Sequence, residues 1–155
     1  MKYQSHNIDV FKVADYILCK SSLDIGDNIS NLKLQKLLYY CQGFVLAITG
    51  KTLFADDILA WEHGPVVKVV YDKYKCYDGY GIKPNDDLPE GYFDDLNDTE
   101  IGQIIDEVWE VYGQYSAWKL RNMTHGEAPW RETMKNQAIS LSKTQSFFKT
   151  RLVDE

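Results

Sequence analysis

The sequence lacks long hydrophobic runs. Its apolar stretches are interrupted every few residues by Lys, Gln, Asp or Gly, and none approaches the roughly 18 residues that a membrane-spanning helix needs. The N-terminal residues Met1 to His6 also lack the continuous apolar stretch of a signal peptide. We therefore expect a soluble, cytoplasmic protein.

Cysteine and histidine are scarce, with three of each among 155 residues. No Cys-x-x-Cys pair occurs and the histidines are far apart, so neither residue type has the ligand spacing of a zinc site. The motifs of a serine nucleophile elbow, a zinc metalloprotease and a phosphate-binding loop are also absent. We expect no metal, no cofactor and no catalytic residue. The enzyme alternative would use His63, Cys41 or His125.

Charge is unevenly distributed along the chain. The net charge of −6 makes a nucleic-acid-binding role the weakest alternative, because phosphate contacts need a basic surface. Residues 78–110 carry eleven acids and one base, whereas residues 116–152 carry seven bases and two acids. Each stretch fits an ordinary solvated face. The alternative is that the acidic stretch attracts a basic partner protein.

Apolar residues at helical spacing predict most of the secondary structure. They recur in this way over residues 10–18 and 101–112. Ser30 and Gly50 are the residue types of an N-terminal and a C-terminal cap, and they predict a helix over residues 31–49. This helix is apolar on several sides, so we expect it at the centre of the fold.

The C-terminal half of the chain predicts two more helices. Ser116 can cap a short helix. Ser142 and Gln145 have the spacing of a capping box, which predicts a C-terminal helix over residues 142–152.

The remaining segments predict a strand, a helix start and a loop. Residues 56–61 are read as extended, and Gly64-Pro65 is read as the start of a helix, with proline at its first position. Residues 78–98 have no helical or alternating period, which is typical of a loop. The fold predicted is an all-α, single-domain bundle of about six helices over residues 1–155, with a small β element at 56–61.

Aromatic residues make up 14% of the chain, with eleven tyrosines. Tyr and Trp anchor many protein interfaces because they bury a large area and keep a polar tip. Tyr74, Tyr77, Tyr80 and Tyr92 lie in or near the acidic stretch, so we consider them a candidate partner-binding surface. Packing in the core is the simpler interpretation for each tryptophan.

Three stretches together resemble a known family. Residues 32–43 read LKLQKLLYYCQG, residues 60–67 read AWEHGPVV, and residues 120–130 end in MTHGEAPW. In this order and separation they are similar to the Panacea domain of SocA-type antitoxins and phage-associated proteins, over roughly residues 8–130. Cys41 stands where the family commonly has alanine. The residues that match the family motifs are Gln35, Lys36, Tyr39, Tyr40, Trp61, His63, Gly64, Pro65, Val66, Tyr71, Thr124, His125, Pro129 and Trp130.

The resemblance implies a mainly helical antitoxin that neutralises a cognate protein toxin by direct contact. It leaves open an adaptor that delivers the toxin to a bacterial protease. Separately, the aromatic-rich composition allows a homodimer without requiring one. We interpret the motif residues as a scaffold, with direct contact to the toxin as the alternative for each of them. Another alternative is that His63 and His125 meet in a polar cluster with Lys36 or Tyr39.

Overall fold

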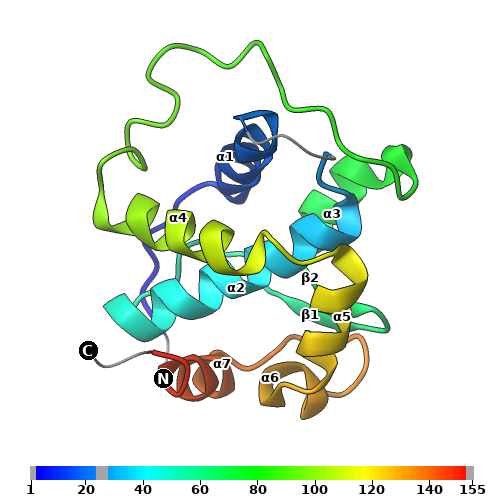
Figure 1. Cartoon of the computed structure of the whole chain (residues 1–155). Coiled ribbons are helices and arrows are strands. Elements are labelled where there is room, and N and C mark those ends of the chain that lie inside the picture. Colours follow the sequence, from blue (N-terminus) through cyan, green and yellow to red (C-terminus); the bar gives the residue numbers. More distant parts are fainter. Residues whose placement is uncertain (1–2, 24–27, 153–155) are drawn as a thin grey trace.

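The computed structural model describes residues 3–23 and 28–152. Within these residues the chain forms seven α-helices and one two-stranded antiparallel sheet, so the predicted mainly helical fold is confirmed (Figure 1). In chain order the elements are α1 (Val10–Leu23), α2 (Asn31–Thr49), β1 (Leu59–Trp61), β2 (Gly64–Val66), α3 (Lys68–Tyr74), the 3-10 turn η1 (Lys75–Tyr77), α4 (Glu100–Tyr112), α5 (Ala117–His125), α6 (Ala128–Arg131) and α7 (Leu141–Lys149).

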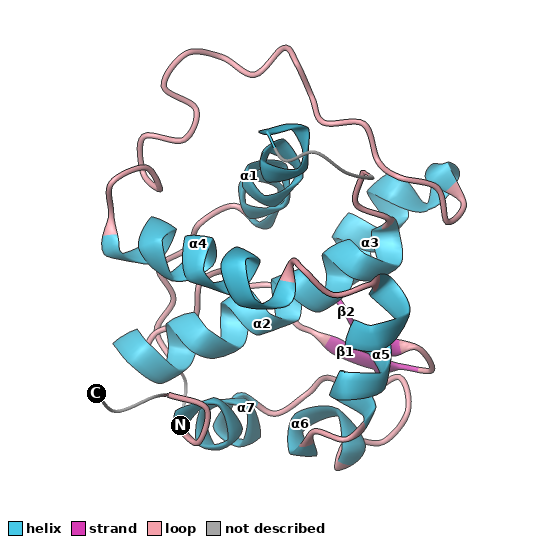
Figure 2. Ribbon diagram, in the orientation of Figure 1, coloured by secondary structure: helices cyan, strands magenta, loops and turns pink. Residues whose placement is uncertain are grey.

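Helix α2 is the central element, as predicted, and it contacts α1, α3, α4, α5, α7 and β2 (Figure 2). The side-chain oxygen of Ser30 accepts a hydrogen bond from the backbone N–H of Lys33 over 3.2 Å. Gly50 ends the helix in the left-handed conformation, with φ of 78°. These two caps fix both ends of the helix where the sequence predicts them.

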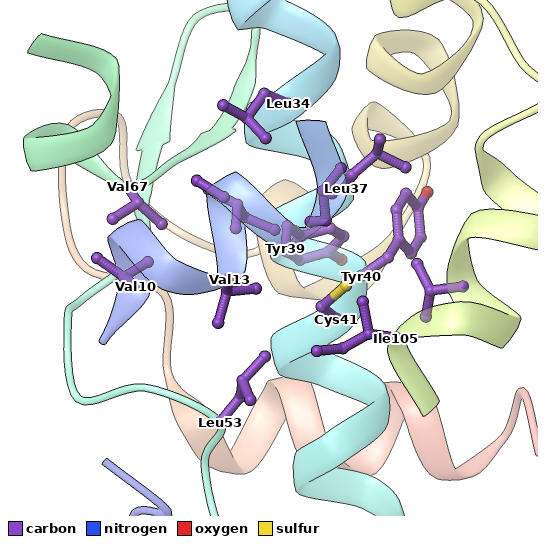
Figure 3. Close-up of a cluster of buried hydrophobic side chains, with 14 of the residues drawn as sticks. Val10, Val13, Leu34, Leu37, Tyr39, Tyr40, Cys41, Leu53, Val67 and Ile105 are labelled. Carbon is purple, nitrogen blue, oxygen red and sulfur yellow. The ribbon is translucent and has the colours of Figure 1, made fainter. Parts of the chain in front are cut away.

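The hydrophobic core forms around the apolar sides of α2. Figure 3 shows α1, α2 and α4 contributing side chains to one cluster, together with Leu53 and Val67 from the connecting segments. The consecutive residues Leu37, Leu38, Tyr39 and Tyr40 of α2 are each at most 1% exposed. Because successive residues of a helix point about 100° apart, α2 is buried on several sides, as its apolar pattern predicts.

Helix α7 packs against the middle of α2, where Gly43 allows close approach. A Cβ atom at position 43 would overlap the ring of Phe148. The N-terminal cap of α7 differs from the prediction, because Ser140 and not Ser142 accepts the hydrogen bond from Lys143 N–H. Gln145 does not reach back to the helix start, since its side-chain oxygen accepts a hydrogen bond from the hydroxyl of Tyr3.

Residues Gly64-Pro65 do not begin a helix, which corrects the prediction. They lie in β2, which pairs with β1 so that Ala60 faces Pro65, and α3 begins only at Lys68. The backbone N–H and C=O of Ala60 bond to Gln137 and Asn136 on the other side of β1. The Ala60–Pro65 pair therefore needs no ladder hydrogen bond, and the missing N–H of proline costs nothing there.

The long segment between η1 and α4 contains neither helix nor strand, as predicted, and it passes α1 at the top of Figure 1. Ile82 near one end is fully buried. Near the other end the hydroxyl of Tyr92 donates to Asp15 over 3.1 Å, and Lys12 pairs with Asp95 over 3.2 Å. The segment is thus anchored at both ends.

Among the helices formed by the described residues, none has both the length and the apolar character needed to cross a membrane.

Candidate functional site

The three sequence motifs meet around the β1–β2 hairpin. The first motif lies on α2, the second forms the hairpin, and the third runs from the middle of α5 into α6. Strand β2 contacts both α2 and α5 (Figure 2). We call this meeting place the motif junction.

Side chains of α2 occupy the edge of β2 that β1 leaves open. The ammonium of Lys36 donates to the carbonyl oxygen of Pro65 over 3.0 Å, and the side-chain oxygen of Gln35 accepts from the N–H of Val67 over 2.9 Å. The amide of Gln35 is itself held by Asn31 at 2.9 Å. These bonds satisfy backbone groups that a third strand would otherwise satisfy, because buried N–H and C=O groups need partners.

Lys36 is the most unusual charged group of the junction. Its side chain has no exposed surface. Burial, with a smaller effect from the positive charge of Arg121, lowers the pKa of Lys36 to about 7. Removal from water disfavours the charged form, so the amine and the ammonium coexist near neutral pH.

Gly64 lies where α2, β2 and α5 come closest. Its φ of +112° is rarely adopted by residues with a side chain, and a Cβ atom there would lie 2.6 Å from Cε of Lys36. The same atom would lie 2.9 Å from Oγ1 of Thr124 on α5. Only glycine fits here without displacing its neighbours.

The third motif closes over the hairpin through its aromatic residues. The indole N–H of Trp130 donates to the carbonyl oxygen of Trp61 over 2.8 Å. The ring of His125 stacks on Trp130, with centroids 3.9 Å apart and planes 3° apart. Burial lowers the pKa of His125, and the charges of Arg121 and Lys36 act in the same direction. Its buried Nε2 has no hydrogen-bond partner within the part of the chain that the structure describes.

The two motif histidines occupy different surroundings. His63 lies in the exposed hairpin turn, where its Nδ1 accepts from Nε of Arg121 over 3.2 Å. His125 lies within electrostatic reach of both His63 and Lys36. Tyr39 does not join this cluster, because its hydroxyl bonds to Glu127.

Glu127 is a buried carboxylate that the sequence analysis did not single out. Its two oxygens accept hydrogen bonds from the hydroxyls of Tyr39 and Tyr40, over 2.9 and 2.8 Å. Burial raises the pKa of Glu127, and the two phenol hydrogen bonds oppose that shift. The contact ties the start of α6 to the middle of α2. The only sequence feature that could have pointed to Glu127 is its position inside the third motif.

A pocket of about 490 Å³ opens beside the junction. Side chains from the first two motifs and from α3 line it, among them Lys36, Trp61 and His63 of the motifs and Tyr71 of α3. Of the remaining motif residues, Val66 and Gln35 also face the pocket, whereas Pro129 and Thr124 are buried outside it.

The structure does not bring Cys41 to this pocket. Cys41 is fully buried in the core (Figure 3), and burial raises the pKa of its thiol. A buried thiol with a raised pKa is a poor nucleophile. Among the described residues, no group of three His, Cys, Asp or Glu side chains has the geometry of a metal site.

The four candidate surface tyrosines are not equally accessible. Tyr74 is 7% exposed and belongs to the core, whereas Tyr80 is 78% exposed. Tyr77 packs half-buried against the core, and Tyr92 is half-buried with its hydroxyl on Asp15. Of these four residues, only Tyr80 presents most of its side chain to a partner.

Comparisons with known proteins match the part of the chain that forms the motif junction. Residues 34–131 match the family described as Antitoxin SocA-like, Panacea domain. The chain is 34% identical over 135 residues to Antitoxin SocA of Caulobacter vibrioides, and this match covers 80% of the chain and 69% of that protein. No solved structure matches the chain. The family match includes residues 34–43 of the first motif and all of the other two, together with the contacts that join them, so the chain belongs to the SocA-like Panacea domain family.

Proposed function

We propose that this chain is a cytoplasmic antitoxin that neutralises a protein toxin by binding it directly. The observation that carries the proposal is the similarity to Antitoxin SocA over 80% of the chain. The motif junction supports the proposal because most of its residues are packed inside the fold and serve as a scaffold. Most of them hold α2, the hairpin and α5 together, which leaves the surrounding surface free to vary with the partner.

Two features of that surface favour protein binding. Trp118, Tyr80 and Met134 are 56%, 78% and 79% exposed. Trp and Tyr anchor protein interfaces, and Met is enriched in them. The stretch 78–110 carries a net charge of −10. Such a charge accelerates the encounter with a basic partner and makes it sensitive to salt.

Co-expression with the product of the adjacent gene tests the proposal. We expect that product alone to stop growth, and we expect the chain to restore growth and to co-purify with it. A chain truncated by an early stop codon is the control. Unrelieved toxicity together with no co-purification would contradict the proposal.

The amount of toxin separates the two modes of neutralisation that the family resemblance implies. Stable accumulation of both proteins supports neutralisation by binding. A fall in toxin that depends on a cellular protease would instead support the adaptor alternative.

A further inference from the structure

An apolar groove lies on the side of the molecule formed by α4 and the C-terminal half of α2. Its volume is about 440 Å³. Phe44 and Ile48 of α2 and Ile104, Val108 and Val111 of α4 supply apolar walls. Arg151 and Leu152, which follow α7, reach its edge.

Several apolar side chains at this groove remain in water. Ile48, Val111 and Leu152 are 43%, 49% and 38% exposed. Single exposed apolar residues are common on protein surfaces. Three that share one hollow form a contiguous patch, which is typical of an interaction site.

Two charged residues line the groove, Glu107 of α4 and Arg151, which follows α7 and lies over the ring of Phe147. Helix α4 contains no lysine or arginine. Glu107 lines the groove and Glu110 lies on the exposed side of the same helix, and neither forms an ion pair with any other described residue. By contrast, Asp106 pairs with Lys20 of α1 at 2.6 Å. The free carboxylates of this helix therefore lie beside the apolar groove.

We infer that this groove is the docking site for an amphipathic helix of the toxin. Its apolar side chains would fill the groove, and its lysine or arginine residues would face Glu107 and Glu110. A helix fits better than a strand because α2 and α4 satisfy their own backbone hydrogen bonds and offer no sheet edge. The inference rests on the proposed antitoxin function and adds the surface and the chemistry of the partner.

Binding of the purified toxin, measured by calorimetry, tests the apolar contact. Val111→Gln should weaken binding roughly tenfold or more, as expected when a buried valine contact is lost. Val69→Gln is the matched control, because Val69 is also a helical valine and is 45% exposed on α3. It should leave binding unchanged. Ile48→Gln repeats the test on the facing helix, and the melting temperature of each variant confirms folding.

The carboxylates are tested separately. The pair of substitutions Glu107→Gln and Glu110→Gln should weaken binding and reduce its dependence on salt, whereas Glu62→Gln in the hairpin turn should do neither.

Three results would overturn the inference. Wild-type affinity in Val111→Gln and Ile48→Gln would exclude the groove as the docking site and leave the proposed antitoxin function intact. A wild-type dimer that these variants dissociate, detected by light scattering, would make the groove a self-interface. Failure of the wild-type chain to bind the toxin would remove the proposed function as well.

Discussion

The buried ammonium of Lys36 donates a hydrogen bond to the carbonyl oxygen of Pro65 over 3.0 Å. This bond joins the central helix to the hairpin, and the neighbouring bond from Val67 N–H to Gln35 reinforces it. It explains why a lysine- and leucine-rich helix and a glycine-proline stretch occur together in this sequence. Each supplies the hydrogen-bond partner that the other needs.

Lys36 should make the stability of the fold depend on pH. Its pKa falls from the ordinary value of 10.5 to about 7 on folding. Between these values the unfolded chain holds a proton that the folded chain has lost, so raising the pH stabilises the fold, by at most about 1.4 kcal/mol per pH unit. Below pH 7 both states hold the proton, and this contribution no longer changes.

The variant Lys36→Met isolates this effect from other titrating groups. Urea unfolding at pH 6, 7.5 and 9 gives the free energy of unfolding of both proteins. The stability of the wild type relative to the variant should rise between pH 7.5 and pH 9. A constant difference across the range would show that Lys36 keeps its ordinary pKa.

Gly64→Ala should destabilise the fold through two separate effects. The first is the positive φ of the residue, which costs roughly 1–3 kcal/mol for a residue with a side chain. The second is the overlap of the new methyl group with Lys36 and Thr124. Gly50→Ala is the matched control, because Gly50 also has a positive φ but a methyl group there would meet no atom within 4 Å.

Chemical unfolding of both glycine variants separates the two effects. Gly64→Ala should lower the free energy of unfolding more than Gly50→Ala does. Equal losses would mean that α2 and α5 yield to the added methyl group and that the junction is loosely packed.

Glu127→Ala should be strongly destabilising, because it leaves the buried hydroxyls of Tyr39 and Tyr40 without an acceptor. An unsatisfied buried polar group costs about 1–3 kcal/mol, so we expect a loss of about 2–5 kcal/mol in the free energy of unfolding. Glu127→Gln should lose less, since its carbonyl oxygen still accepts one phenol. Similar losses in the two variants would argue against the role of the hydrogen bonds.

Substitution of the most exposed candidate tyrosine, Tyr80, and of the most buried one, Tyr74, should have opposite effects on binding and on stability. Tyr80→Ala removes a side chain that is 78% exposed, so it should weaken toxin binding at an unchanged melting temperature. Tyr74→Ala removes a side chain that is 7% exposed, so it should lower the melting temperature. Toxin binding that is unaffected in Tyr80→Ala would exclude this part of the acidic stretch from the interface.

Local signals in the sequence predicted the helical framework. Ser30 and Gly50 act on backbone groups within a few residues of themselves, so the ends of α2 could be predicted from their immediate neighbours. Gly64-Pro65 could not, because its conformation depends on Lys36, which is 29 residues away from Pro65. Proline is common at the first position of a helix, and it also fits a strand position whose N–H makes no ladder hydrogen bond. Only the contact with α2 decides between these two conformations.

The motif junction could not be predicted from local sequence for the same reason. Glu127 resembles an ordinary exposed acid in the sequence, and the two phenols that bury it lie 88 and 87 residues away. The match to the three motifs identified their residues, while the structure supplied the contacts between them.

Mixing the purified chain with its purified toxin tests the central claim most directly. We expect a stable complex of defined stoichiometry by light scattering, with toxin activity abolished at equivalence and without any protease or cofactor added. A toxin that stays fully active with excess chain, and elutes apart from it, would contradict neutralisation by direct binding.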